Sequence, residues 1–165
     1  MKGLDVRKLE RQLNIKPRKE DVFLNLVSQI SRLSTGFRRQ GAILVKDDEV
    51  ISSGFFDAYP SVGNPKEDDK ERKEKGSGAI ENCIASCARK GVCTDGASLY
   101  VYSFPNDIQC KLLARAGIRE IRFLKDIEST DGKKLCIEKG IKVFLEGRVF
   151  LEGNVTTPSV SSNKK

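Results

Sequence analysis

The chain contains five cysteines and no histidine, so the cysteines are its strongest candidates for metal binding or nucleophilic chemistry. Cysteine thiolates can bind zinc. Histidine, which this chain lacks, is the commonest neutral zinc ligand and a common general base. Cys83 and Cys87 lie four residues apart, and Cys93 and Cys110 follow them. The spacings C-x3-C, C-x5-C and C-x16-C match no strong zinc template. A cysteine-rich metal site stays open as one interpretation, and burial of the thiols as small apolar groups is the favoured one.

Helix and strand patterns alternate around these cysteines. Apolar residues at three- and four-residue spacing predict helices at 79–90 and 106–116, the second with Asn106 or Asp107 as N-cap. Each helix is followed by a short run rich in β-branched and aromatic residues, which predicts strands at 97–104 and 118–124. The strand, helix and strand from 97 to 124 form a βαβ unit, so its two strands should be parallel.

The remaining elements lie on both sides of this unit. A helix is predicted at 20–33, where a clear apolar stripe recurs at helical spacing. It is followed by an antiparallel hairpin with strands at 41–46 and 50–55. A short helix at 131–139 and a fifth strand at 141–145 complete the pattern.

Together these elements predict an α/β fold, a three-layer α-β-α sandwich around a five-stranded mixed sheet. The helix at 20–33 should cover one face, and the helices at 79–90 and 106–116 the other. A chain of 165 residues with 38% apolar residues suits one domain. We expect a charged N-terminal segment at 1–19, the domain at 20–145 and a C-terminal tail at 146–165. We also expect a long loop at 57–77, with a mobile insertion from Pro65 to Lys75.

Several stretches of this sequence resemble the deoxycytidylate and cytidine deaminase family. They are AIENCI at 79–84, GASLYVYSFP at 96–105, KLLARAGIREIRF at 111–123 and, as the family's first hairpin, RRQGAILVKDDEVISSGF at 38–55. The resemblance covers roughly residues 20–145 and implies a cytidine-deaminase-like sandwich. Zinc-dependent members of the family carry His-x-Glu at the start of one helix and Pro-Cys-x-x-Cys at the start of the next.

The resemblance places the catalytic motif on residues that cannot perform its chemistry. The metal-binding histidine falls on Gly78, the proton-transferring glutamate on Ile80, and the two cysteines on Asn106 and Gln109. Glycine has no side chain, amides are poor substitutes for thiolates, and isoleucine cannot transfer a proton. The family's zinc cofactor therefore has no ligands here, and no residue is assigned as catalytic. We interpret the chain as an inactive deaminase-fold protein, a pseudoenzyme with a regulatory, structural or partner-binding role.

Two alternatives from other classes stay open. An active zinc-dependent dCMP or cytidine deaminase would need non-standard ligands such as the cysteines. A nucleic-acid-binding module on the same scaffold is permitted by the net charge of +7, although no arginine-rich run with interleaved aromatic residues supports it. The turn that approaches substrate in the family is replaced by Gly54-Phe55-Phe56-Asp57, so substrate-binding residues are unassigned. The helix N-termini at Gly78 and Asn106 would still offer backbone N–H groups to a phosphate.

Partners and location follow from the same observations. The resemblance implies a homo-oligomer, or a hetero-oligomer with an active relative, formed through helix surfaces. A nucleotide or nucleic acid is a further candidate partner. A membrane is not expected, because no long apolar run is present. An odd number of cysteines without a signal peptide favours an intracellular, reducing compartment, the cytoplasm or the nucleus.

Overall fold

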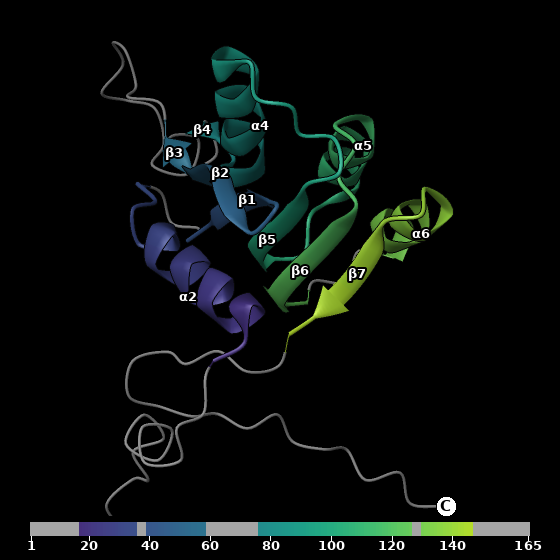
Figure 1. Cartoon of the computed structure of the whole chain (residues 1–165), viewed down its shortest axis with the longest axis horizontal. Helices are drawn as coiled ribbons and strands as arrows, with labels where there is room; N and C mark the ends of the chain where they lie inside the picture. Colours follow the sequence, from purple (N-terminus) through teal and green to yellow (C-terminus); the bar gives the residue numbers. More distant parts are fainter. Residues whose placement is uncertain (1–16, 36–38, 59–75, 127–129, 147–165) are drawn as a thin grey trace, which may run out of the picture.

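The structure, a computed structural model, describes residues 17–35, 39–58, 76–126 and 130–146. These residues form four helices and seven strands (Figure 1). The helices are α2 (Lys19–Ser31), α4 (Ala79–Lys90), α5 (Asp107–Arg115) and α6 (Thr130–Glu138). The strands are β1 (Gly41–Lys46), β2 (Glu49–Phe55), β3 (Asp57–Ala58), β4 (Gly76–Ser77), β5 (Ser98–Ser103), β6 (Glu120–Lys125) and β7 (Lys142–Leu145). Among the described residues, no helix is both long and apolar enough to cross a bilayer.

The main sheet has five strands in the order β2-β1-β5-β6-β7. β1 pairs antiparallel with both β2 and β5, whereas β5, β6 and β7 run parallel to one another. Asp47 and Asp48 both have positive φ, 52° and 64°, which is the backbone of the tight turn between β1 and β2. The predicted five-stranded mixed sheet, its hairpin and its parallel βαβ unit are therefore confirmed.

Helices cover both faces of this sheet, as predicted (Figure 1). On one face, Leu24 and Val27 of α2 pack against Ile43, Val45 and Tyr100. On the other face, α4, α5 and α6 enclose the larger core, whose buried members include Leu99, Leu113, Ile121 and all four buried cysteines. The fold is thus the expected three-layer α-β-α sandwich.

The turns between these elements follow from their sequence. Gly91 ends α4 in the left-handed conformation, with φ of 68°, which glycine adopts without a Cβ penalty. The expected loop at 57–77 differs from the structure at both ends, because Asp57 pairs with Ser77 and Ala58 with Gly76 as the antiparallel ribbon β3–β4. No local apolar pattern marks such short strands, so the ribbon could not be predicted. The insertion expected at 65–75 lies outside the described residues, as do 1–16 and 147–165.

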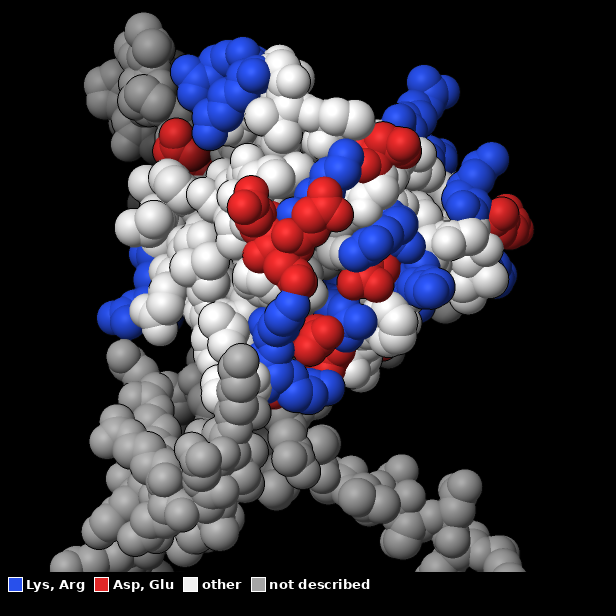
Figure 2. Space-filling model, viewed as in Figure 1, with Lys and Arg blue, Asp and Glu red and all other residues white. Residues whose placement is uncertain are grey.

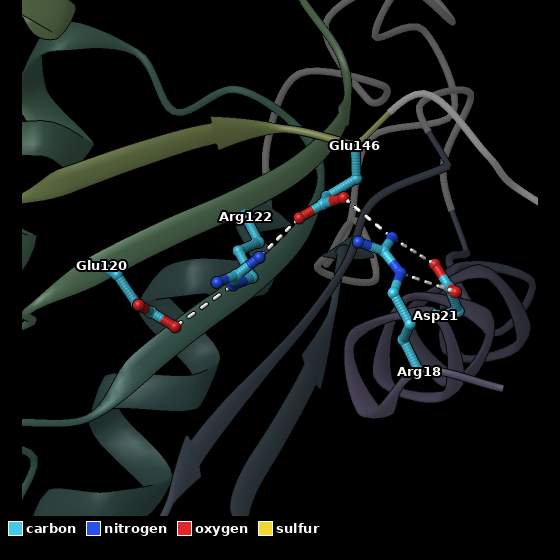
Figure 3. Close-up of polar contacts among 5 residues, drawn as sticks. All are labelled: Arg18, Asp21, Glu120, Arg122 and Glu146. Carbon is cyan, nitrogen blue, oxygen red and sulfur yellow. Dashed lines mark hydrogen bonds and ion pairs between the residues drawn. The ribbon is translucent and has the colours of Figure 1, made fainter. Parts of the chain in front are cut away.

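A chain of ion pairs connects the start of α2 to the end of β7 (Figure 3). Arg122 Nη1 lies 2.5 Å from Glu146 Oε1, and Arg122 Nε lies 3.2 Å from Glu120 Oε1. Arg18 Nη2 contacts Glu146 Oε2 at 3.2 Å and Asp21 Oδ1 at 2.8 Å. The Glu146 backbone N–H also donates to Phe123 O at 2.9 Å. Glu146, assigned from the sequence to the tail, is therefore fixed against the sheet.

Candidate functional site

The four positions that the family motif would occupy lie at the N-termini of α4 and α5. Gly78 is the N-cap of α4, and Ile80 lies in its first turn. Asn106 is the N-cap of α5, and Gln109 is the third residue of that helix. The sequence therefore predicted correctly which elements carry these residues. Their side chains determine what the site can do.

Asn106 and Gln109 are bound to each other as a capping box. The Asn106 side-chain Oδ1 accepts from the Gln109 backbone N–H at 2.9 Å, and the Gln109 side-chain Oε1 accepts from the Asn106 backbone N–H at 3.0 Å. This reciprocal pair satisfies two backbone donors that the first turn of a helix otherwise leaves open. Both side-chain oxygens are therefore engaged in holding the start of α5.

Glu81 connects this capping box to α4. Gln109 Nε2 donates to Glu81 Oε1 at 3.0 Å and to Glu81 Oε2 at 3.2 Å. The same carboxylate fills the space beside Gly78, where an added Cβ would lie 2.9 Å from Glu81 Cδ and would overlap one carboxylate oxygen. Gly78 and Gln109 thus contact the same carboxylate, that of Glu81, which was not among the residues predicted for the site.

A sequence signal for Glu81 did exist. It is the acidic residue in the first turn of α4, where a negative side chain is favoured by the helix dipole. Its carboxylate also accepts a hydrogen bond from Gln109 in the first turn of α5. The Glu81 carboxylate is therefore a negative charge at the N-termini of both helices. An added phosphate at this point would meet a like charge, and the anion site expected at Gly78 and Asn106 is therefore disfavoured.

Ile80 points into the core and away from this polar cluster. Its side chain is 3% exposed and belongs to the cluster that includes Cys83 and Cys87. A residue in that position contributes apolar packing between α4 and the sheet. The position carried over for the family's glutamate is therefore occupied by a core residue.

Asn82 fixes the chain where it enters α4. Its side-chain Nδ2 donates to Phe55 O at 2.9 Å and to Ser77 O at 3.3 Å, and the Ser77 hydroxyl donates to Asn82 Oδ1 at 2.5 Å. Phe56, next to Phe55, is buried. The segment Gly54-Phe55-Phe56-Asp57 therefore leads from β2 into β3, and the Asn82 side chain hydrogen-bonds it to the start of α4.

Burial of the thiols as small apolar groups is confirmed for three of the four cysteines near the site. Cys83, Cys87 and Cys110 are fully buried in the larger core, whereas Cys93 is exposed. The Cys83 thiol donates to Ala42 O at 3.3 Å, and burial raises the pKa of Cys83 to about 12. Within the described part of the chain, no group of three or more His, Cys, Asp or Glu side chains is arranged to hold a metal ion.

We expect one thiol, Cys93, to react with an aromatic disulfide reagent in the folded protein at neutral pH. Thiolates are the reactive form, and burial keeps Cys83 protonated until strongly alkaline pH. Counting released chromophore with and without denaturant tests this, with one equivalent expected before unfolding and five after. A Cys93→Ser variant should abolish the fast reaction. Rapid labelling of Cys83 or Cys87 in native protein would contradict the burial.

Comparison with known structures identifies the architecture. A dCMP deaminase from the cyanophage S-TIM5, in complex with dCMP and dUMP, superimposes with a TM-score of 0.69 at 21% identity, over 80% of this chain and 99% of that one. This chain has the cytidine-deaminase fold. A diaminohydroxyphosphoribosylaminopyrimidine deaminase/5-amino-6-(5-phosphoribosylamino)uracil reductase from Thermotoga maritima shares it, with a TM-score of 0.59 at 22% identity over 77% of this chain and 36% of that one.

Sequence comparison adds a further relative. The ComE operon protein 2 of Bacillus subtilis is 28% identical over 110 residues, which are 64% of this chain. The match spans 56% of that protein's length, so the chain covers little more than half of this relative. No family model matches the sequence. The likeness to these solved structures establishes the cytidine-deaminase fold and no activity.

Proposed function

We propose that this chain is a non-catalytic protein with the cytidine-deaminase fold, acting as a regulatory, structural or partner-binding subunit. The observation that carries the proposal is the Glu81–Gln109 contact between the two helix N-termini. Gln109 and Gly78 lie at positions of the family's zinc ligands, and the Glu81 carboxylate lies between them. This contact connects the first turns of the two helices directly.

The donor set does not fit zinc. A catalytic zinc site needs three nitrogen, thiolate or carboxylate ligands and an open position for water. Gly78 supplies no donor, and the side-chain oxygens of Asn106 and Gln109 accept backbone hydrogen bonds. Among the described residues at these helix starts, Glu81 supplies the carboxylate, and both its oxygens accept from Gln109 Nε2. A single carboxylate is too few ligands.

Proton transfer lacks its residue as well. In zinc deaminases a glutamate that is not a metal ligand carries the proton between water and the base. Here that position is Ile80, which is buried in the core. General acid–base catalysis typically contributes about 10²–10⁴-fold in rate, and an absent metal removes the nucleophile in addition. We therefore expect no measurable hydrolytic deamination.

The test is a paired measurement of metal content and turnover. Protein produced in zinc-supplemented medium should contain no stoichiometric zinc and release no ammonia from dCMP, CMP or cytidine. The dCMP deaminase of cyanophage S-TIM5, prepared and assayed in parallel, provides the matched positive control. About one zinc per chain, with turnover abolished by a chelator, would overturn the proposal. Zinc without turnover would indicate a structural cysteine site.

The two alternatives receive less support. An active deaminase with non-standard ligands would have to recruit thiols such as Cys83, which is buried, protonated and bound to Ala42 O. A nucleic-acid-binding module would present a basic surface. On the face drawn in Figure 2, acidic and basic side chains are interspersed and no basic stripe is visible. We therefore favour association with a partner, for which an active relative and a second copy of the chain are the candidates.

A further inference from the structure

β7 forms one edge of the main sheet, and its backbone groups alternate between that edge and β6. The N–H groups of Lys142 and Glu146 donate to Arg119 O at 3.0 Å and Phe123 O at 2.9 Å, so these residues face the sheet. Successive residues of a strand point their backbone groups to opposite sides. Val143 and Leu145 therefore direct N–H and C=O outward, where the described elements place no strand.

The two edges of the sheet differ in how they are protected. At the other edge, the pairing of β2 with β1 has a register shift between Leu44 and Val45, a bulge of the kind that hinders further strand addition. β7 pairs in continuous register with β6 and contains no proline. Its Phe144 and Leu145 are 36% and 57% exposed. An edge that is straight, apolar and open is a template for another strand.

We propose that β7 pairs antiparallel with β7 of a second copy of this chain, about a two-fold axis at Phe144. The sequence Lys142-Val143-Phe144-Leu145-Glu146 complements itself in this alignment. Val143 and Leu145, whose backbone groups face outward, form hydrogen-bonded pairs with Leu145 and Val143 of the second copy. Phe144 lies opposite its own copy, and Lys142 lies opposite Glu146, in non-hydrogen-bonded pairs where side chains are closest.

The ion pairs of Figure 3 hold the Glu146 carboxylate in place at the edge strand, where it would meet Lys142 of the second copy. Arg122 and Arg18 hold its carboxylate on the α2 side of the sheet, and the Arg122 guanidinium carbon lies 4.2 Å from the centre of the Phe144 ring. Lys142 of the second copy would lie opposite Glu146 and add a positive charge beside its carboxylate. Charge complementarity therefore favours a second copy as the occupant.

The chain's own C-terminal segment is the competing occupant. The sequence VFLEG at 143–147 recurs at 149–153, so a second strand-like segment follows β7 closely. A tight hairpin through a two-residue turn at 147–148 would pair 146 with 149 by backbone hydrogen bonds. The Glu146 N–H, however, already donates to Phe123 O on the opposite side. The register of β7 therefore disfavours this two-residue hairpin.

Mass and amide exchange of the full-length protein at several concentrations test the proposal. We expect light scattering to show the mass rising to that of a dimer with concentration. The Val143 and Leu145 amides should exchange more slowly in the dimer, and the Phe144 amide, which faces β6, should be protected throughout. A monomer at all concentrations would overturn the proposal. Protection of Val143 and Leu145 that does not depend on concentration, and disappears when 147–165 are removed, would assign the edge to the chain's own tail.

Two variants address the surface directly. Leu145→Pro removes an outward N–H without affecting the bonds to β6, and it should give a folded monomer. Lys142→Glu sets like charges opposite each other twice per dimer and should raise the dimer Kd about tenfold. Lys111→Glu, the same charge change at an exposed position of α5, is the matched control and should leave the Kd unchanged. A dimer that tolerates both edge variants would place the interface elsewhere.

Discussion

Replacing Gly78 with histidine and both Asn106 and Gln109 with cysteine is expected to give a protein that binds about one zinc ion per chain. The three positions converge in the structure, because Gln109 reaches Glu81 and Glu81 fills the space beside Gly78. The exchange removes the amide that holds Glu81, so its flexible carboxylate can rotate away from the new histidine. Ile80 is kept in this variant, because a glutamate there would enter an apolar core.

A matched control separates ligation from repacking. The variant with alanine in place of histidine at Gly78 carries the same two cysteines and a Cβ at the same point, but lacks the third ligand. We expect it to bind no stoichiometric zinc in the same metal analysis. Losing the capping box at Asn106 should cost both variants about 0.5–2 kcal/mol of unfolding free energy, so folding is checked by thermal denaturation. A folded triple variant without zinc would show that the helix N-termini are too far apart for tetrahedral ligation.

Much of the fold was predictable because its elements carry strong local signals. Apolar residues at helical spacing, among them Ile80, Cys83 and Cys87, predicted a helix at 79–90, and α4 has these bounds with Gly91 as its C-cap. The main strands were predicted to within two or three residues at each end, since β-branched runs between turn residues define them. The ribbon β3–β4 was missed because its two-residue strands pair across a long sequence separation and have no periodicity of their own.

The sequence predicted where the candidate site lies but not which side chains contact one another there. The motif carried over to Gly78, Asn106 and Gln109 located the two helix N-termini correctly. It gave no weight to Glu81, because that residue lies one position after the one expected to transfer protons. Its role depends on the absence of a Cβ at Gly78 and on the rotamer of Gln109, both properties of the folded structure. Glu146 was missed for a similar reason, since its ion pairs come from residues distant in sequence.

Replacing Gly54 with alanine is expected to lower the free energy of unfolding by about 1–3 kcal/mol, as overpacking does in well-packed cores. A Cβ at this point of β2 would overlap the backbone carbonyl of Ala79 and lie 3.0 Å from the Cys83 backbone nitrogen. These are backbone atoms of α4, so the whole helix must move to make room. Gly54 also pairs with Ala42, and this small pair allows α4 to approach the sheet closely.

Chemical denaturation of Gly54→Ala, beside Ser53→Ala as the matched control, measures this effect. Ser53 is the exposed neighbour on the same strand, and its replacement should change stability by no more than about 0.5 kcal/mol. Alanine in place of glycine also stabilises by about 0.4–1 kcal/mol where it fits, because it restricts the unfolded chain. The sign of the change is therefore decisive: a stabilised Gly54→Ala protein would mean that α4 lies further from β2. In that case the contact of Glu81 with Gln109, which depends on the position of the first turn of α4, would also have to be reconsidered.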